Sequence, residues 1–77
     1  MNNKKKELMS NLAIGRRVLE MRKKRGYTQL QLATRVGIER KSIGRLEHGE
    51  TLLRTDMIMD IAKELNTSME YIMTGKK

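Results

Sequence analysis

Residues 27–49, YTQLQLATRVGIERKSIGRLEHG, contain two short helical patterns separated by a tight turn. The first pattern opens with Thr28 as a candidate N-cap, and Gln31 three positions later completes a capping box. It stops at Gly37, and the second pattern occupies residues 40–48. Because two short helices joined by about three residues that include a glycine must cross steeply, this stretch predicts a helix-turn-helix.

Amphipathic patterns on both sides of this stretch predict three more helices. Cations in the last turn and Gly26 just beyond them end the first helix. Thr55 with Asp56 is the candidate N-cap of the fourth helix. Either Thr67 or Ser68 starts the fifth helix, and Thr67 with Glu70 would form a capping box. No strand pattern is present, so the expected fold is all-α with five short helices. The apolar positions that helical spacing directs inward are Ile14, Val18, Met21, Leu32, Ala33, Val36, Ile38, Ile43, Leu46, Ile58, Ile61, Ala62, Leu65, Met69, Ile72 and Met73.

The composition restricts the function classes that suit this chain. Its 77 residues form one small domain with 17 Lys and Arg, 9 Asp and Glu, and a formal net charge of +8. The sequence has no cysteine and one histidine, which argues against disulfides and against metal sites built from these residues. A catalytic cleft is difficult to support in so short a chain, and no nucleophile stands beside a base. We therefore expect a binding protein for a polyanion, not an enzyme, with no cofactor or metal.

The charge is distributed unevenly and suggests three segments. Residues 1–54 carry 14 basic and 5 acidic side chains, whereas residues 55–77 carry 3 and 4. We expect a flexible basic arm at 1–10, a DNA-binding domain at 11–75 and a tail at 76–77. The arm, with its lysines at positions 4–6, is either a solvated tail or a DNA contact. The sequence shows neither a membrane span of about 18 apolar residues nor a secretory signal, which favours the cytoplasm.

Three fragments carry a resemblance to a known family: IGRRVLEMRKKRGYTQLQLA at 14–33, RVGIERKSIGRLEHG at 35–49 and IAKELNTSMEYIMTG at 61–75. Together they resemble the helix-turn-helix family of phage repressors and Cro proteins, the xenobiotic-response-element (XRE) class of regulators. The resemblance implies a lambda-repressor-like DNA-binding domain whose second and third helices form the helix-turn-helix. It also implies a transcriptional regulator, most often a repressor, that binds a palindromic double-stranded DNA operator as a dimer through the major groove.

The resemblance assigns roles to particular residues of the predicted third helix. Its outward face is polar and cationic, and a helix in the major groove offers its N-terminal residues to base edges. The fork of an arginine side chain can bond O6 and N7 of guanine together. Arg40, Lys41 and Arg45 match base-reading positions of the family, and Ser42 matches a position that contacts either bases or backbone. We expect base contacts from these four residues.

Other positions match the family's phosphate contacts and its internal ion pair. The phosphate contacts fall on Thr28, Gln29, Arg54 and Thr55. Arg22 and Glu47 match two positions that the family joins by an internal ion pair, so we expect them to stabilise the fold and not to read DNA. The sequence departs from the family at Glu39, where a Ser or Thr N-cap is common, and at Gly44 within the helix.

The sequence contains more apolar residues than the core requires, which suggests contacts with other protein chains. Met57, Met59, Met69, Tyr71 and Met73 enrich the C-terminal part, and the family usually dimerises there, so we expect a homodimer through the fourth and fifth helices. No small-molecule ligand is expected in so short a chain. The alternative function is an antitoxin-type protein-interaction module that neutralises a partner protein, with DNA binding secondary. Its candidate contact residues, expected to be exposed, are Leu30, Leu52 and Leu53.

Overall fold

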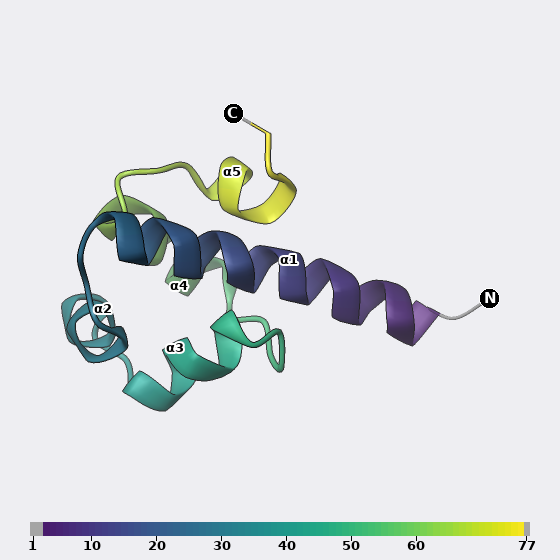
Figure 1. Ribbon diagram of the computed structural model, residues 1–77, viewed down its shortest axis with the longest axis horizontal. Coiled ribbons are helices and arrows are strands. Elements are labelled where there is room, and N and C mark those ends of the chain that lie inside the picture. The colour runs from purple at the N-terminus through teal and green to yellow at the C-terminus, as the bar shows by residue number, and fades with distance from the viewer. Residues whose placement is uncertain (1–2, 77) are drawn as a thin grey trace.

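The computed structural model describes residues 3–76, with side chains from Ser10 to Lys76, and this part of the chain contains five α-helices and no strand (Figure 1). The helices are α1 (Asn3–Lys24), α2 (Gln29–Val36), α3 (Arg40–Glu47), α4 (Thr55–Glu64) and α5 (Met69–Thr74). This confirms the predicted all-α fold, with the helix-turn-helix formed by α2 and α3.

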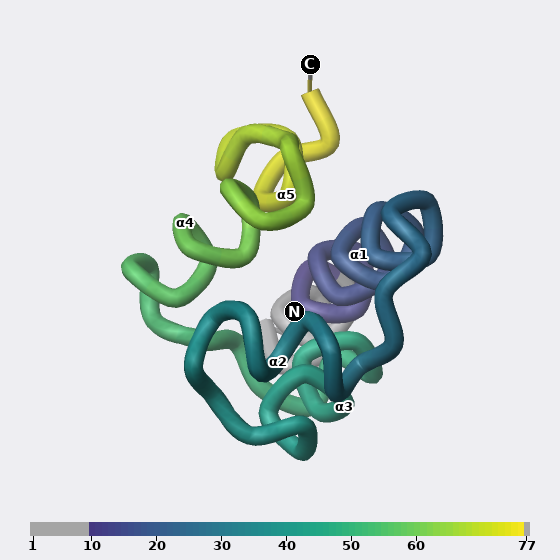
Figure 2. Tube along the Cα trace, turned by 90° about the vertical axis from the view of Figure 1, so that its left-hand side faces the viewer, coloured from purple at the N-terminus to yellow at the C-terminus, as the bar shows by residue number. Residues whose placement is uncertain are grey.

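The long helix α1 is the element around which the others are arranged. It packs against α3 on one side and against α5 on another, while α2 packs against both α3 and α4. Figure 2, which looks nearly along α1, shows α2 and α3 on one side of the molecule and α5 on the opposite side. The helix pair that resembles a DNA reader therefore lies apart from the C-terminal helix.

The core at the centre of these helices consists mainly of the apolar positions predicted from helical spacing. Its buried members are Ile14, Val18, Leu32, Ala33, Ile43, Leu46, Ile58, Ile61, Ala62, Leu65 and Ile72. Met21, Val36, Ile38 and Met69 are partly buried against this cluster. Met73 is 36% exposed, and the prediction that it points inward is wrong, because the single buried row of α5 is filled by Ile72 with Met69 beside it.

The turn between α2 and α3 has the geometry that its sequence predicts. The hydroxyl oxygen of Thr28 accepts a hydrogen bond from the backbone N–H of Gln31 at 3.0 Å, and the Gln31 side chain accepts from the N–H of Thr28 at 2.8 Å. Gly37 has φ +77°, a left-handed conformation that side chains with a Cβ rarely adopt. The N–H of Ile38 then bonds to the carbonyl of Ala33 at 2.9 Å, which closes the turn.

Helix α1 begins earlier than expected. Its backbone is helical from Asn3, so the segment predicted to be a flexible arm at 1–10 belongs in large part to the helix. Lysine and glutamate are good helix formers, and extending an existing helix costs far less than starting one. The side chains of the lysines at 4–6, and all of Lys77 in the predicted tail, lie outside the described residues.

The start of α4 differs from prediction, whereas α5 starts at one of its two predicted candidates. The N-cap of α4 is Arg54, which makes no side-chain cap bond, so the expected cap at Thr55 and Asp56 is wrong by one residue. For α5 the cap is Ser68, whose hydroxyl accepts from the N–H of Tyr71 at 3.0 Å. Helical spacing alone defines the first residue of a helix only to within one or two positions.

The two leucines in the loop between α3 and α4, both predicted to be exposed, differ in burial. Leu52 is 42% exposed, but Leu53 packs against the core, so the expectation that Leu53 is exposed is wrong. Extended backbone turns successive side chains to opposite sides, and only one of the pair faces the helices.

Helices α1 and α3 are in close backbone contact at Gly15. A Cβ at this position would collide with the backbone carbonyl oxygen of Leu46 and would lie 3.0 Å from the Cα of Glu47. Both neighbours are backbone of a packed helix and cannot move aside as a side-chain tip would. A glycine at this position therefore sets the distance between the two helices.

We expect Gly15→Ala to lower the free energy of unfolding by about 1–3 kcal/mol, because overpacking forces the two helices apart. Gly44→Ala is the matched control, since a Cβ at Gly44 would lie 3.7 Å from the Gln29 side chain. Alanine inside a helix is favoured over glycine by about 0.5–1 kcal/mol, so the control should be stabilised. Urea denaturation followed by circular dichroism measures both variants, and equal stability of the two would contradict this account of the crossing.

Candidate nucleic-acid interface

Helix α3 has one buried face and one exposed cationic face. Ile43, Leu46 and Glu47 are the buried residues of the helix. Helical spacing places Lys41 and Arg45 on the opposite side, and both are exposed. A short helix that buries one face and presents cations on the other has the shape and charge for a DNA groove.

A shallow hollow of about 370 Å³ lies between this exposed face and the start of α2. Gly44 contributes no side chain to it, so the hollow is open where a larger residue would fill it. The residues that line the hollow are Gln29, Arg40, Lys41, Gly44, Arg45, His48 and Glu50. Three arginine or lysine side chains against one glutamate give the lining a net positive charge.

Beneath the hollow, an ion pair joins α1 to α3. The Nε of Arg22 donates to Glu47 Oε2 at 2.6 Å, and its Nη2 donates to Oε1 at 3.0 Å. The side chain of Glu47 is fully buried, and that of Arg22 is 10% exposed. The remaining terminal nitrogen of Arg22, Nη1, donates to the backbone carbonyl of Tyr27 at 2.8 Å. A single guanidinium thus holds the recognition helix and the residue that precedes the N-cap of α2.

Gln29 extends this network to the surface. Its side-chain nitrogen Nε2 donates to Glu47 Oε1 at 2.9 Å, and its oxygen Oε1 accepts from Nη1 of Arg40 at 3.1 Å. Because a carboxylate only accepts hydrogen bonds, the amide nitrogen must face Glu47 and the amide oxygen must face Arg40. The charge pair in the core therefore determines how the first residue of α3 is held.

The predicted DNA contacts do not all meet in one place. Arg40, Lys41, Arg45 and Gln29 line the hollow, whereas Ser42, Thr28, Arg54 and Thr55 do not. Ser42 is half-buried at the side of α3, and the hydroxyl of Thr28 is already used in the capping box. The hollow is thus formed by three of the four predicted base contacts and one of the four predicted phosphate contacts.

Arg54 is engaged with a neighbouring carboxylate at the start of α4. Its Nη2 donates to Asp56 Oδ2 at 2.9 Å, and its Nε donates to Oδ1 at 3.3 Å. These hydrogen bonds from Arg54 hold the pKa of Asp56 below its ordinary value. Both side chains are largely exposed, so the pair can open when a stronger anion approaches.

Sequence reasoning missed His48 and the hollow beside Gly44. His48 follows Lys41 by seven positions and Arg45 by three, which places all three on one helical face. That spacing was available from the sequence. The hollow was not, because it depends on how closely α2 and α3 approach each other.

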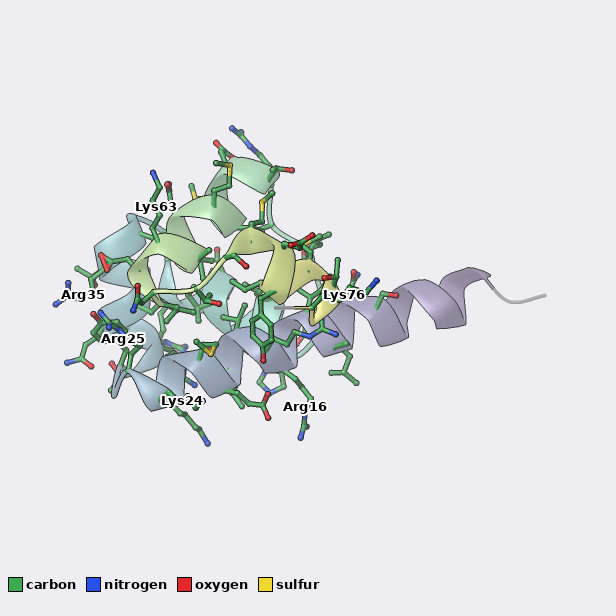
Figure 3. All side chains as sticks on the ribbon, turned by 90° about the horizontal axis from the view of Figure 1, so that it is seen from above. Arg16, Lys24, Arg25, Arg35, Lys63 and Lys76 are labelled. Atoms are coloured by element: carbon green, nitrogen blue, oxygen red, sulfur yellow. The ribbon has the colours of Figure 1, made fainter. Side chains whose placement is uncertain are left out.

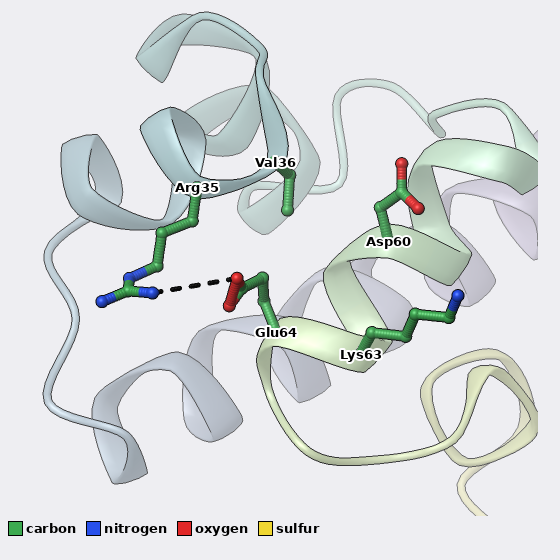
Figure 4. Close-up of a pocket in the computed structure, with 5 residues that line it drawn as sticks. All are labelled: Arg35, Val36, Asp60, Lys63 and Glu64. Carbon is green, nitrogen blue, oxygen red and sulfur yellow. Dashed lines mark ion pairs between the residues drawn. The ribbon is translucent and has the colours of Figure 1, made fainter.

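Other charged surfaces lie away from this interface. Figure 3 shows Lys24, Arg25, Arg35, Lys63 and Lys76 at the surface, on or beside α1, α2, α4 and α5. A cleft of about 290 Å³ between α2 and α4 is lined by Arg35, Val36, Asp60, Lys63 and Glu64 (Figure 4). Nη1 of Arg35 lies 3.8 Å from Oε1 of Glu64 in this cleft. Its mixed charge contrasts with the positive hollow on α3.

No group of three or more acidic or histidine side chains between residues 10 and 76 is arranged to hold a metal ion. Within the same part of the chain, every helix is too short or too polar to cross a membrane.

Comparison with known proteins agrees with this geometry. A family model described as "Helix-turn-helix" matches residues 18–72. The chain belongs to the XRE-type helix-turn-helix family. The matched region begins within α1 and ends in α5, so it contains the ion pair, the helix-turn-helix and most of the core.

Relatives in this family differ in length. The chain is 36% identical over 63 residues to the uncharacterized HTH-type transcriptional regulator YazB of Bacillus subtilis, covering 82% of this chain and 91% of YazB. It is 38% identical over 64 residues to the antitoxin PezA of Streptococcus pneumoniae, covering 83% of this chain and 40% of PezA. A crystal structure of an HTH_3 family transcriptional regulator from Vibrio cholerae matches with a TM-score of 0.78 at 23% identity, covering 91% of this chain and 39% of that chain. This structural match shows the same fold.

We expect Glu47→Ala to lower the free energy of unfolding by about 3–5 kcal/mol, because it leaves the buried charge of Arg22 without a partner. Glu20→Ala on the exposed surface of α1 is the control and should change stability by no more than about 0.5 kcal/mol. Replacing both partners, Arg22→Met with Glu47→Leu, should recover most of the loss. Chemical denaturation measures all three proteins, and a double variant less stable than Glu47→Ala would argue against an uncompensated charge as the cause.

Proposed function

We propose that this chain is a sequence-specific, double-stranded DNA-binding regulator of transcription, of the repressor type. The observation that carries this proposal is the exposed cationic face of α3, with Arg40 held by Gln29 and the Arg22–Glu47 pair beneath it. The family to which the chain belongs supports the same function. In this proposal α3 lies in the major groove and the N-terminal end of α2 faces the DNA backbone.

Base recognition in this proposal rests chiefly on Arg40 and Arg45. An arginine carries five N–H donors in a planar fork, and the bond from Arg40 to Gln29 uses one of them. The others remain for a guanine, and the held geometry reduces the side-chain entropy lost on binding. Lys41, on the same exposed face, supplies a further cation for a base edge or a phosphate.

Phosphate contacts in this proposal come from the starts of two helices. The first backbone N–H groups of α2 have no intrahelical partner, so the backbone of Gln29 can donate to a phosphate while its side chain holds Arg40. At the start of α4, Arg54 can exchange its exposed bond to Asp56 for a phosphate, with Thr55 beside it. The hydroxyl of Thr28 contributes mainly through its cap.

A homodimer through α4 and α5 completes the proposal. Met59 on α4 is 45% exposed and Met73 on α5 is 36% exposed, which leaves apolar side chains on the helices away from the recognition face. A two-fold dimer places its recognition helices in successive major grooves about 34–36 Å apart, so the operator is expected to be a rough palindrome.

A second candidate function is favoured by a specific observation. Leu30, on the outer side of α2, is 59% exposed, the largest exposed fraction among the large apolar side chains of the described residues. PezA, one of the relatives, is an antitoxin. We therefore keep the alternative of a module that neutralises a partner protein, with DNA binding secondary. A Leu30→Ser variant that no longer binds the partner protein but still binds DNA would favour this alternative function.

We expect Arg40→Ala and Arg45→Ala each to weaken operator binding by about 1–3 kcal/mol and to relax the preference at one base pair. Lys63→Ala is the control, because it removes one positive charge from α4 outside the hollow. Selection of bound sites from a random duplex library, followed by titration, measures both effects. If both arginine variants ranked the selected sites as the wild type does, base readout by α3 would be refuted.

We expect the protein to sediment as a dimer at tens of micromolar, and Met59→Glu with Met73→Glu to shift it to monomer by placing charges in the proposed interface. Leu52→Glu is the control, since Leu52 is equally exposed but lies in the loop before α4. Analytical ultracentrifugation with and without duplex DNA gives the result. A wild-type monomer under both conditions would remove the dimer from the proposal.

A further inference from the structure

The ring of His48 is oriented by the backbone of α3. His48 is the C-cap of the helix, and its exposed side chain folds back so that Nδ1 lies 2.7 Å from the carbonyl oxygen of Gly44. A carbonyl oxygen only accepts hydrogen bonds, so Nδ1 must carry the hydrogen and donate it. The same carbonyl also accepts from the backbone N–H of His48 at 3.1 Å. Two bonds to one acceptor thus hold the ring against the recognition helix.

This orientation assigns a specific chemistry to the other ring nitrogen, Nε2. In the neutral ring Nδ1 holds the single hydrogen, so Nε2 presents a bare lone pair and can only accept. When the ring gains a proton, Nε2 becomes a charged donor, suited to a phosphate oxygen or to the acceptors of guanine. Histidine is the side chain that makes this change between about pH 5 and 8.

The charged side chains around His48 are mostly cationic. Lys41 and Arg45 share its helical face, and Arg40 lines the same hollow. Gln29 is the only contribution of α2 to that lining, and it is uncharged. The single carboxylate in the lining is Glu50, two residues beyond the ring.

Helix α1 packs against α3 at Gly15 and also carries exposed charged residues after this crossing. They are Arg16, Glu20, Lys23 and Lys24. The charged lining of the hollow is net positive, and a polyanion that covers the hollow adds negative charge beside the ring.

We propose that His48 is a further DNA-contacting residue, and that binding of duplex DNA adds a proton to its ring. This inference rests on the proposed function, because it requires that α3 faces DNA. The proton is taken from solvent and placed on Nε2, which then donates to a phosphate or guanine acceptor. DNA affinity must then rise as the pH falls, while contacts from lysine and arginine give no such dependence in this range.

The test measures binding of a short duplex of random sequence at low ionic strength between about pH 5.5 and 7.5, for the wild type and for His48→Gln. The chain has one histidine, so this variant removes the only imidazole. We expect wild-type affinity to increase as the pH falls, by at most about tenfold per pH unit for each histidine, and His48→Gln to lose this increase. Lys41→Gln is the matched control: it should bind more weakly at every pH and keep the wild-type slope.

A second measurement does not depend on any variant. The ring proton resonance of His48 in the wild type should titrate at a higher pH with the duplex present than without it. Equal pH slopes for wild type and His48→Gln, or an unchanged titration midpoint, would overturn this inference while leaving duplex binding intact. A wild-type protein that binds no duplex even at low salt would instead overturn the proposed function itself.

Discussion

The buried ion pair between Arg22 and Glu47 is the interaction on which the cationic surface of α3, the proposed DNA contact, depends. It joins α1 to α3 through two hydrogen bonds and reaches the carbonyl of Tyr27 through a third. Such a pair is costly to desolvate, and apolar residues of similar size often stabilise a fold as well. Its particular contribution here is geometric. It presents a fixed acceptor, Glu47 Oε1, to the first residue of α2, which no apolar replacement would provide.

The side-chain amide of Gln29 connects this acceptor to the protein surface. Gln29 turns its nitrogen toward Glu47 and its oxygen toward Arg40, so an arginine at the protein surface is positioned by a carboxylate in the core. A long exposed side chain normally loses much rotamer freedom when it binds. Partial immobilisation before binding reduces that cost and favours one direction of the guanidinium fork, which suits discrimination between bases.

The same surface shows how small residues create space between helices. Gly15 allows α1 to lie directly on the backbone of α3, and Gly44 leaves a hollow on the opposite side of that helix. The first glycine is required by backbone contact, whereas the second has room for a methyl group and costs some helix stability. Gly44 also leaves its carbonyl accessible to the ring of His48, which connects the open hollow to the orientation of Nε2.

The five helices, the capping box at Thr28 and most of the core followed from the sequence, because helical period and turn chemistry are local properties that tertiary contacts here reinforce. The cationic face of α3 was also predicted from the sequence alone, and the family resemblance implied that Arg22 pairs with Glu47. Other features needed three dimensions: which leucine of the loop is buried, which way the Gln29 amide points, and whether Arg54 is free or bound to Asp56. The buried leucine and the direction of the amide are determined by the groups that the packed helices bring into contact, and the Arg54–Asp56 bond is determined by the conformation at the start of α4.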